Sequence, residues 1–226
     1  MPSSSAFSII WDENFWLPEN TTWADLRSTA TVKYPQFFEL SYAVVVGACL
    51  LVLRLLVESF VYLPIGYAFG WIDTSKGLFK RIVDHLNFGF MAHQSRFRRV
   101  AETAWRFTFY TSIWVIGIMV ISKQPQFREV DECWRNWPNH PISNGVWWYF
   151  IVEAGFYWSL LFSTFVIDVR RSDFWQMMLH HFVTILLLSI SWTLNFVRMG
   201  SLVLLTHDTS DVLLYTLFYY SQASIE

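Results

Sequence analysis

Five apolar stretches dominate the hydrophobic pattern of this chain. Each is about 20 residues long, which is the length that an α-helix needs to cross roughly 30 Å of hydrocarbon. The pattern therefore predicts an all-α, polytopic helical membrane protein. We expect about five transmembrane helices, at residues 37–61, 105–122, 146–167, 175–196 and 201–220.

Composition supports a membrane protein. The 226 residues are 54% hydrophobic and only 15% charged, which is too apolar for an ordinary soluble domain. The two cysteines, Cys49 and Cys133, fall in an apolar span and in a polar loop, so neither a disulfide nor a cysteine metal site is expected. No basic segment precedes an apolar stretch in the first 16 residues, so we expect no cleavable signal peptide.

The distribution of Lys and Arg predicts how the chain is oriented. Positive residues are retained on the cytoplasmic side of a membrane, and here they follow the first and third spans. Both loops are therefore expected in the cytosol and the N-terminus in the lumen, where the sequon at Asn20 would be glycosylated. The segment 123–145 would also be lumenal. The cations concerned are Lys76, Lys80, Arg81, Arg96, Arg98, Arg99, Arg170 and Arg171.

The basic stretch at 75–99 interleaves cations with aromatic residues, a pattern also found in nucleic-acid binding. A cytosolic loop beside a span is basic for topological reasons alone, so no nucleic-acid partner is expected. The chain then divides into three parts. These are a lumenal N-terminal segment at 1–36, the first transmembrane helix with its basic cytosolic loop at 37–104, and a helical bundle at 105–221.

The first span contains two charged residues, Arg54 and Glu58. They are four residues apart, so they share a helical face and can offset each other's burial. We interpret them as a structural ion pair.

The fourth and fifth spans carry the candidate chemistry: His180 and His181 on one, and His207, Asp208 and Asp211 on the other. An aspartate at membrane depth costs about 2.5–3.5 kcal/mol on insertion scales, which favours a functional role. Asp208 and Asp211 are three apart and share a face, whereas His207 is predicted to point about 100° away. Because the two spans form an antiparallel hairpin, the two histidines of the fourth span and the two acids of the fifth are expected at similar depth, within hydrogen-bonding distance. The pocket between them is expected to open toward the cytosol.

A carboxylate beside a histidine orients the imidazole and raises its basicity, as general-base or nucleophilic acyl transfer requires. The structural alternative is a polar cluster that only fixes helix packing. Metal binding is the other chemical alternative. The six histidines are too few for the repeated boxes of a membrane di-iron oxygenase, and no metal is expected, although three ligands for a mononuclear site could be gathered here.

Several motifs resemble the signature region of the ceramide synthases, which are TLC-domain membrane proteins. They are AWRFTFY at 104–110, YWSLLFS at 157–163, DVRR at 168–171, LHH at 179–181, SW at 191–192 and HDTSD at 207–211. The resemblance covers about the last 120 residues well and the first 100 more loosely, and it makes 105–221 a TLC-domain bundle.

The resemblance implies an enzyme of the endoplasmic reticulum membrane that transfers a fatty acyl group from acyl-CoA to the amine of a sphingoid base. Acyl-CoA is a co-substrate, and no other cofactor is implied. By motif position the catalytic residues are His180, His181, Asp208 and Asp211. A histidine held by an aspartate could act as a base, or His180 could carry the acyl group as an acyl-imidazole; the sequence does not choose.

Family members usually continue past the HDTSD-type motif into further helices, whereas this sequence ends fifteen residues after Asp211. The resemblance therefore implies an incomplete, C-terminally truncated bundle with little activity of its own. Two alternatives follow: a non-catalytic TLC-domain protein for lipid sensing or an accessory role, and an inactive short isoform. Such an isoform would form a homo- or hetero-dimer with a related synthase. The preferred acyl chain length is not predicted.

Overall fold

Helices make up all the regular structure in the part of the chain that the computed structural model describes, which is residues 11–70, 72, 75, 77–87, 96–168 and 172–223. The prediction of an all-α fold is confirmed. The helices are α2 (Glu13–Trp16), α3 (Leu40–Val57), α4 (Leu63–Ala68), α5 (Leu78–Leu86), α6 (Arg96–Ile121), α7 (Asn144–Val166), α8 (Phe174–Thr193) and α9 (Val197–Ala223). Short 3-10 turns lie at Phe37–Glu39, Pro125–Phe127 and Val130–Cys133.

Four helical stretches are long and apolar enough to cross a membrane: Phe37–Ala68, Val100–Ile121, Asn144–Val166 and Phe174–Thr193. They match the first four expected spans, so the polytopic membrane architecture is confirmed. The fifth expected span lies within α9, which is not among these four. At 27 residues, α9 would extend about 40 Å, so it has the length but carries the polar HDTSD segment.

The first span is longer than predicted because the helix continues through a local irregularity. A π-helical turn, Glu58–Tyr62, joins α3 to α4. Pro64 follows in the first turn of α4, and proline cannot donate the backbone hydrogen bond that a regular α-helix would need there. The wider turn accommodates this missing donor and allows the span to run to Ala68.

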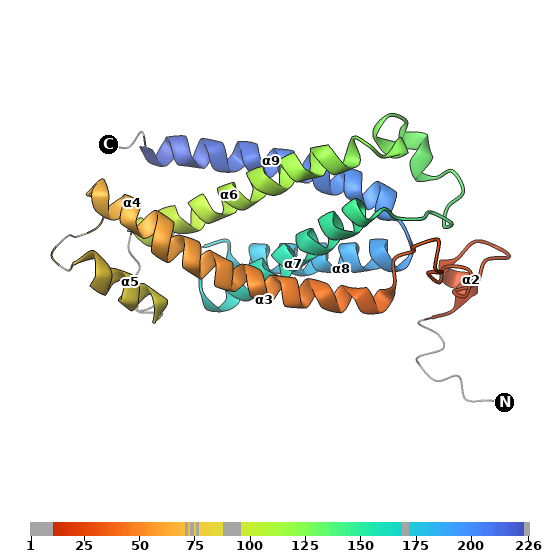
Figure 1. The fold of residues 1–226 in the computed structure, drawn as a ribbon, viewed down its shortest axis with the longest axis horizontal. Coiled ribbons are helices and arrows are strands. Elements are labelled where there is room, and N and C mark those ends of the chain that lie inside the picture. Colours follow the sequence, from red (N-terminus) through yellow and green to blue (C-terminus); the bar gives the residue numbers. More distant parts are fainter. Residues whose placement is uncertain are drawn as a thin grey trace, which may run out of the picture.

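The helices alternate in direction along one bundle, with α9 lying along α6 and with α3, α7 and α8 grouped together (Figure 1). The N-terminal segment, the α6–α7 connection and the α8–α9 turn gather at one end. Two hydrogen bonds tie these segments: Ile142 N donates to Lys33 O (2.9 Å), and Trp192 Nε1 donates to Gln36 O (2.9 Å). The alternation is the one that the orientation prediction requires, while the compartment at each end stays a prediction.

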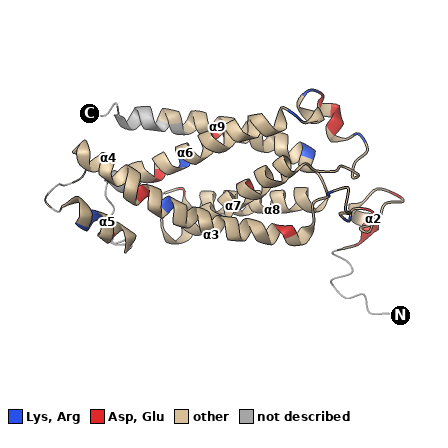
Figure 2. Ribbon diagram, in the orientation of Figure 1, with Lys and Arg blue, Asp and Glu red and all other residues tan. Residues whose placement is uncertain are grey.

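The opposite end carries α4, α5 and the C-terminal end of α9 (Figure 1). Figure 2 shows few charged residues on the helices between the two ends of the bundle. Of the expected cytosolic cations, Lys80 and Arg81 lie on α5. The others lie outside the described residues, either wholly, as for Lys76, Arg170 and Arg171, or in their side chains, as for Arg96, Arg98 and Arg99.

The charged pair expected in the first span is confirmed, with Arg54 Nε 2.7 Å from Glu58 Oε1. The pair also belongs to a larger buried network. Arg54 Nη1 lies 2.8 Å from Asp168 Oδ1, and Arg106 Nη2 on α6 lies 2.7 Å from Asp168 Oδ2. His85 Nε2 on α5 lies 3.3 Å from Glu58 Oε2. The network therefore joins α3, α5, α6 and the end of α7.

Helices α3 and α7 approach each other closely at two glycines. A Cβ atom on Gly155 would lie 2.9 Å from Ala43 O and 2.8 Å from Val46 Cγ1, and one on Gly47 would lie 2.7 Å from Gly155 O. These distances are shorter than ordinary carbon contacts, and small residues allow such close crossings between membrane helices.

We therefore expect Gly155→Ala to force α3 and α7 apart and to destabilise the protein by about 1–3 kcal/mol, the usual cost of overpacking. Gly145→Ala on the same helix is the matched control, because its Cβ would meet only the Val120 side chain, at 3.3 Å, and no backbone atom. Thermal unfolding in detergent measures both variants. Equal midpoints for Gly155→Ala and the unsubstituted protein would show that the crossing is not tight.

Candidate functional site

Histidines from α8 and α9 lie side by side, at the place where the sequence predicted the α8 histidines to meet the α9 acids. The ring centroids of His180 and His207 are 5.8 Å apart, and those of His180 and His181 are 5.5 Å apart. His180 is exposed, whereas only 2% of the His181 surface is exposed. The α8 helix therefore presents one accessible imidazole and one buried imidazole to the same cluster.

The position of His207 differs from the prediction. It was expected to point away from the acids, but His207 Nδ1 lies 3.6 Å from Asp211 Oδ2. The physical reason is helical spacing: residues four apart face the same side, and the prediction compared His207 only with its neighbour Asp208. His180, His207 and Asp211 thus form a continuous chain of side chains, called here the outer layer.

The acids also find partners other than those predicted. Direct hydrogen bonds from His180 or His181 to Asp208 or Asp211 were expected, and none forms among the described residues. Instead, Tyr149 Oη donates to Asp208 Oδ2 at 3.1 Å. Both ring nitrogens of His181 lack a hydrogen-bond partner, and its ring faces Tyr157 at 6.3 Å between centroids.

A fully buried group of polar side chains lies behind the outer layer, and we call it the inner layer. Asp208 and Glu153 have no exposed surface, and Tyr149 and His181 are each 2% exposed. Glu153 and Tyr149 come from α7, so three helices contribute to the cluster. The outer layer can meet a substrate, whereas the inner layer can act only through its contacts with neighbouring side chains.

Sequence reasoning missed Glu153 and Tyr149. The signal for Glu153 was present, because it is the only acidic residue in the third span, and the reasoning applied to Asp208 applies equally to it. Tyr149 gave no signal, since a tyrosine in an aromatic span is ordinary. Among the described residues, no three His, Cys, Asp or Glu side chains are grouped so as to hold a metal ion. The imidazoles and carboxyl groups of the cluster can support acid–base and nucleophilic chemistry.

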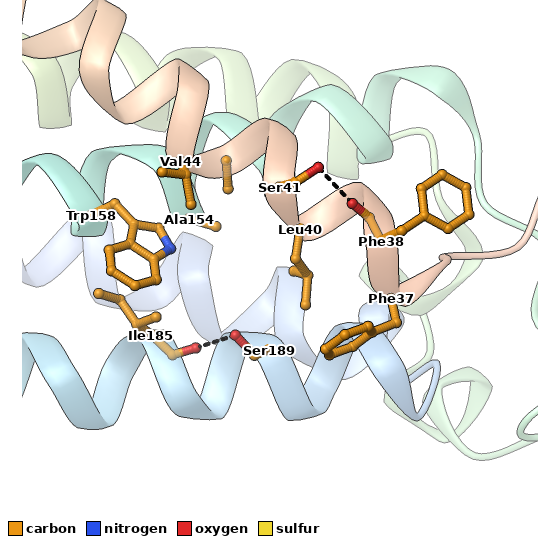
Figure 3. A pocket seen from close by; sticks show the side chains of 10 residues that line it. Phe37, Phe38, Leu40, Ser41, Val44, Ala154, Trp158, Ile185 and Ser189 are labelled. Atoms are coloured by element: carbon orange, nitrogen blue, oxygen red, sulfur yellow. Dashed lines mark hydrogen bonds between the residues drawn. The ribbon is translucent and has the colours of Figure 1, made fainter. Parts of the chain in front are cut away.

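Two apolar hollows lie away from this cluster, toward the end of the bundle that holds the N-terminal segment. One, of about 330 Å³, lies between α3, α7 and α8 and is lined by Leu40, Trp158 and Ile185 among others (Figure 3). The other, of about 390 Å³, lies between α8 and the tryptophans of the N-terminal segment. Phe37 and Ser189 line both hollows, so the two adjoin. Neither contains a residue of the His and Asp cluster.

Residues 99–226 match the TLC domain family, which is more than half of the chain. The chain belongs to this family. Its resemblance to the ceramide synthases is also confirmed. This TLC-domain chain is 40% identical to ceramide synthase hyl-1 of Caenorhabditis elegans over 92% of its own length and 55% of the relative's. It is 35% identical to ceramide synthase hyl-2 of the same organism, over 90% of its own length and 60% of the relative's.

A third relative is human ceramide synthase 5, which is 34% identical over 94% of this TLC-domain chain and 63% of the human protein. The chain therefore spans between about half and two thirds of the length of these three relatives. The matched region includes the whole of the His and Asp cluster.

Proposed function

We propose that this chain carries the acyl-transfer site of a ceramide synthase in the endoplasmic reticulum membrane. The site would transfer a fatty acyl group from acyl-CoA to the amine of a sphingoid base, with no further cofactor. The observation that carries the proposal is the outer layer, in which an accessible His180 is followed by His207 and then by Asp211. The similarity to ceramide synthases supports the same reaction.

The outer layer fits the proton chemistry of this reaction. The sphingoid amine arrives as an ammonium and must give one proton to a base before its lone pair can attack the thioester carbonyl. An imidazole can take that proton, and the Asp211 carboxylate beside His207 stabilises the resulting positive charge. The new C–N bond forms as the C–S bond breaks, and CoA leaves as a thiol after receiving a proton.

A covalent route uses the same residues. The exposed ring of His180 could attack the thioester first and hold the acyl group as an acyl-imidazole, which the amine then attacks. This route predicts that labelled acyl-CoA marks the protein when no amine is present. The direct route predicts no such labelling, so the comparison distinguishes them.

The proposed function is tested by incubating membranes that contain the chain with a sphingoid base and acyl-CoAs of several lengths. We expect N-acylated product above the level of membranes without the chain, because the outer layer supplies the base that the amine needs. Membranes from cells without endogenous ceramide synthases provide the background. Product formation that does not depend on the chain at any acyl length would contradict the proposal.

The proposed orientation has its own test at Asn20. This residue is exposed in a turn at the N-terminal end of the bundle, and Thr22 Oγ1 of the sequon donates to Asp25 Oδ2 at 2.8 Å. In microsomes we expect a glycosidase-sensitive increase in apparent mass that Asn20→Gln abolishes. Asn14→Gln is the matched control, because Asn14 is exposed but lies outside a sequon. An unmodified Asn20, together with a 75–99 loop protected from external protease, would reverse the orientation.

A further inference from the structure

Glu153 is the most unusual polar residue of the cluster, because its charge has no evident compensation. The side chain is completely buried, and neither carboxyl oxygen receives a hydrogen bond. Asp208 is also completely buried, and its Oδ1 atom likewise lacks a partner. A buried carboxylate without a donor or a cation is strongly unfavourable, so the arrangement of these two residues requires an explanation.

The two carboxyl groups face each other across the contact between α7 and α9. Glu153 lies within hydrogen-bonding range of Asp208, and Asp211 acts on it from farther away. Tyr149 and Tyr157 on α7 face the same acids, and His207 on α9 interacts electrostatically with Asp208. In the part of the chain that the structure describes, neither Glu153 nor Asp208 forms an ion pair with a lysine or an arginine.

Two ionised carboxylates at this range would repel each other strongly in a medium of low dielectric constant. One shared proton changes that repulsion into a short O–H···O contact with a single negative charge. The same proton would pair one unpartnered oxygen of Glu153 with the unpartnered Oδ1 of Asp208, because a carboxyl group donates only when it is protonated. Tyr149, which donates to Asp208 Oδ2, stabilises the charge that remains on Asp208.

We propose that Glu153 and Asp208 share one proton, and that this pair positions a single negative charge behind the catalytic histidines. The role of this charge behind the catalytic histidines rests on the proposed function. When the imidazole takes a proton from the substrate ammonium, one N–H bond breaks and another forms, while the pair keeps its proton and its charge. The fixed charge then stabilises the imidazolium without requiring two anions in the membrane interior. Glu153 is thus a positioning residue that acts through Asp208.

The shared proton can be tested without any activity, by infrared spectroscopy of the purified chain. A protonated carboxylic acid has a carbonyl stretch that an ionised carboxylate lacks. We expect the difference between the unsubstituted protein and Glu153→Gln to contain this acid band at neutral pH. The glutamine amide can still donate to Asp208 and so leaves that residue ionised. Glu132→Gln, at an ion pair near the surface, is the control and should change carboxylate bands only.

The positioning role is tested by comparing two substitutions at Glu153 in the N-acylation assay. Glu153→Gln keeps a donor toward Asp208 and should retain turnover within about tenfold, whereas Glu153→Leu removes it and should lower kcat by about 100-fold, with a small change in KM. If Glu153→Leu does not fold, the glutamine variant and its spectrum still decide the question.

The outcomes separate the two proposals. An acid band without any N-acylation would leave the carboxyl pair standing and contradict the proposed function. N-acylation without an acid band would overturn the shared proton and leave the proposed function standing. Equal loss of kcat in the glutamine and leucine variants would overturn the positioning role.

Discussion

Replacing His180 with alanine is expected to lower the turnover of N-acylation by at least about 100-fold, because general acid–base catalysis typically contributes between 10² and 10⁴. His180 is the accessible imidazole of the outer layer, and its ring lies 5.8 Å from that of His207. Asp211→Asn should have an effect of similar size, since the amide cannot stabilise a charged His207. Membrane insertion should be nearly unchanged in both variants.

The losses in this cluster should not add. Residues that stabilise one transition state act as a unit, so the double variant His180→Ala with Asp211→Asn should be little worse than the poorer single variant. His181→Ala and Asp208→Asn are expected to abolish turnover as well, through the inner layer. Ser189→Ala is the matched control on α8, because Ser189 lines the apolar hollow and its hydroxyl donates to the backbone oxygen of Ile185. Turnover within a few-fold of normal for His180→Ala would contradict the assignment.

Asp168→Asn is expected to destabilise the fold by about 3–5 kcal/mol, the usual effect of breaking a buried ion pair. Asp168 accepts from Arg54 and Arg106, and Ser163 Oγ also donates to Asp168 Oδ1 at 2.7 Å. Neutralising it leaves two arginines facing each other at the junction of α3, α6 and α7. Thermal unfolding in detergent measures the loss.

Two comparisons test this network further. Adding Arg106→Met to Asp168→Asn restores the charge balance and should recover part of the lost stability. Arg135→Gln, at an ion pair whose arginine side chain is 59% exposed, should cost less than about 1 kcal/mol. An Asp168→Asn variant that unfolds at the normal temperature would show that the network is dispensable.

The contacts of Asp168 with its two arginines are also expected to be insensitive to pH near neutrality. Burial alone would raise the pKa of Asp168, but the charges of Arg54 and Arg106 outweigh it and hold that pKa well below its usual range. A carboxyl group with a depressed pKa contributes its full stability above the ordinary value of about 3.9 and loses it only in stronger acid. Asp168→Asn should therefore lower the unfolding temperature by the same amount at every pH between about 6 and 8.

Hydropathy and helical spacing were sufficient for those parts of the structure that depend on nearby residues. The first four spans follow from runs of apolar residues, and the contact between Arg54 and Glu58 follows from their separation of four. The approach of His180 to α9 could be predicted because a short turn joins the two helices, although its neighbour there is His207 and not an aspartate. Each of these results depends only on residues close in the sequence or on the single hairpin between α8 and α9.

Contacts between helices distant in the sequence could not be predicted in the same way. The links from Arg54 to Asp168 and from Tyr149 to Asp208 join residues 114 and 59 positions apart, and they depend on how whole helices are rotated and packed. The site prediction was wrong about His207 for a different reason, since the four-residue spacing to Asp211 was already present in the sequence. The sequence could have identified Glu153 as a buried acid, but it could not have identified Asp208 as its neighbour.

The most direct test of the acyl-transfer site is the stoichiometry of the reaction in liposomes that contain only the purified chain. Acyl-CoA and sphingoid base are supplied, and the CoA thiol and the N-acylated product are measured together. We predict equal amounts of thiol and amide over many turnovers, with continued turnover only when the sphingoid base is present and with both products lost in His180→Ala. Repeated thiol release without sphingoid base, beyond the single thiol per chain that an acyl-imidazole would free, would contradict the assignment of the outer layer as the reacting site. Amide formation that persists in His180→Ala would contradict it as well.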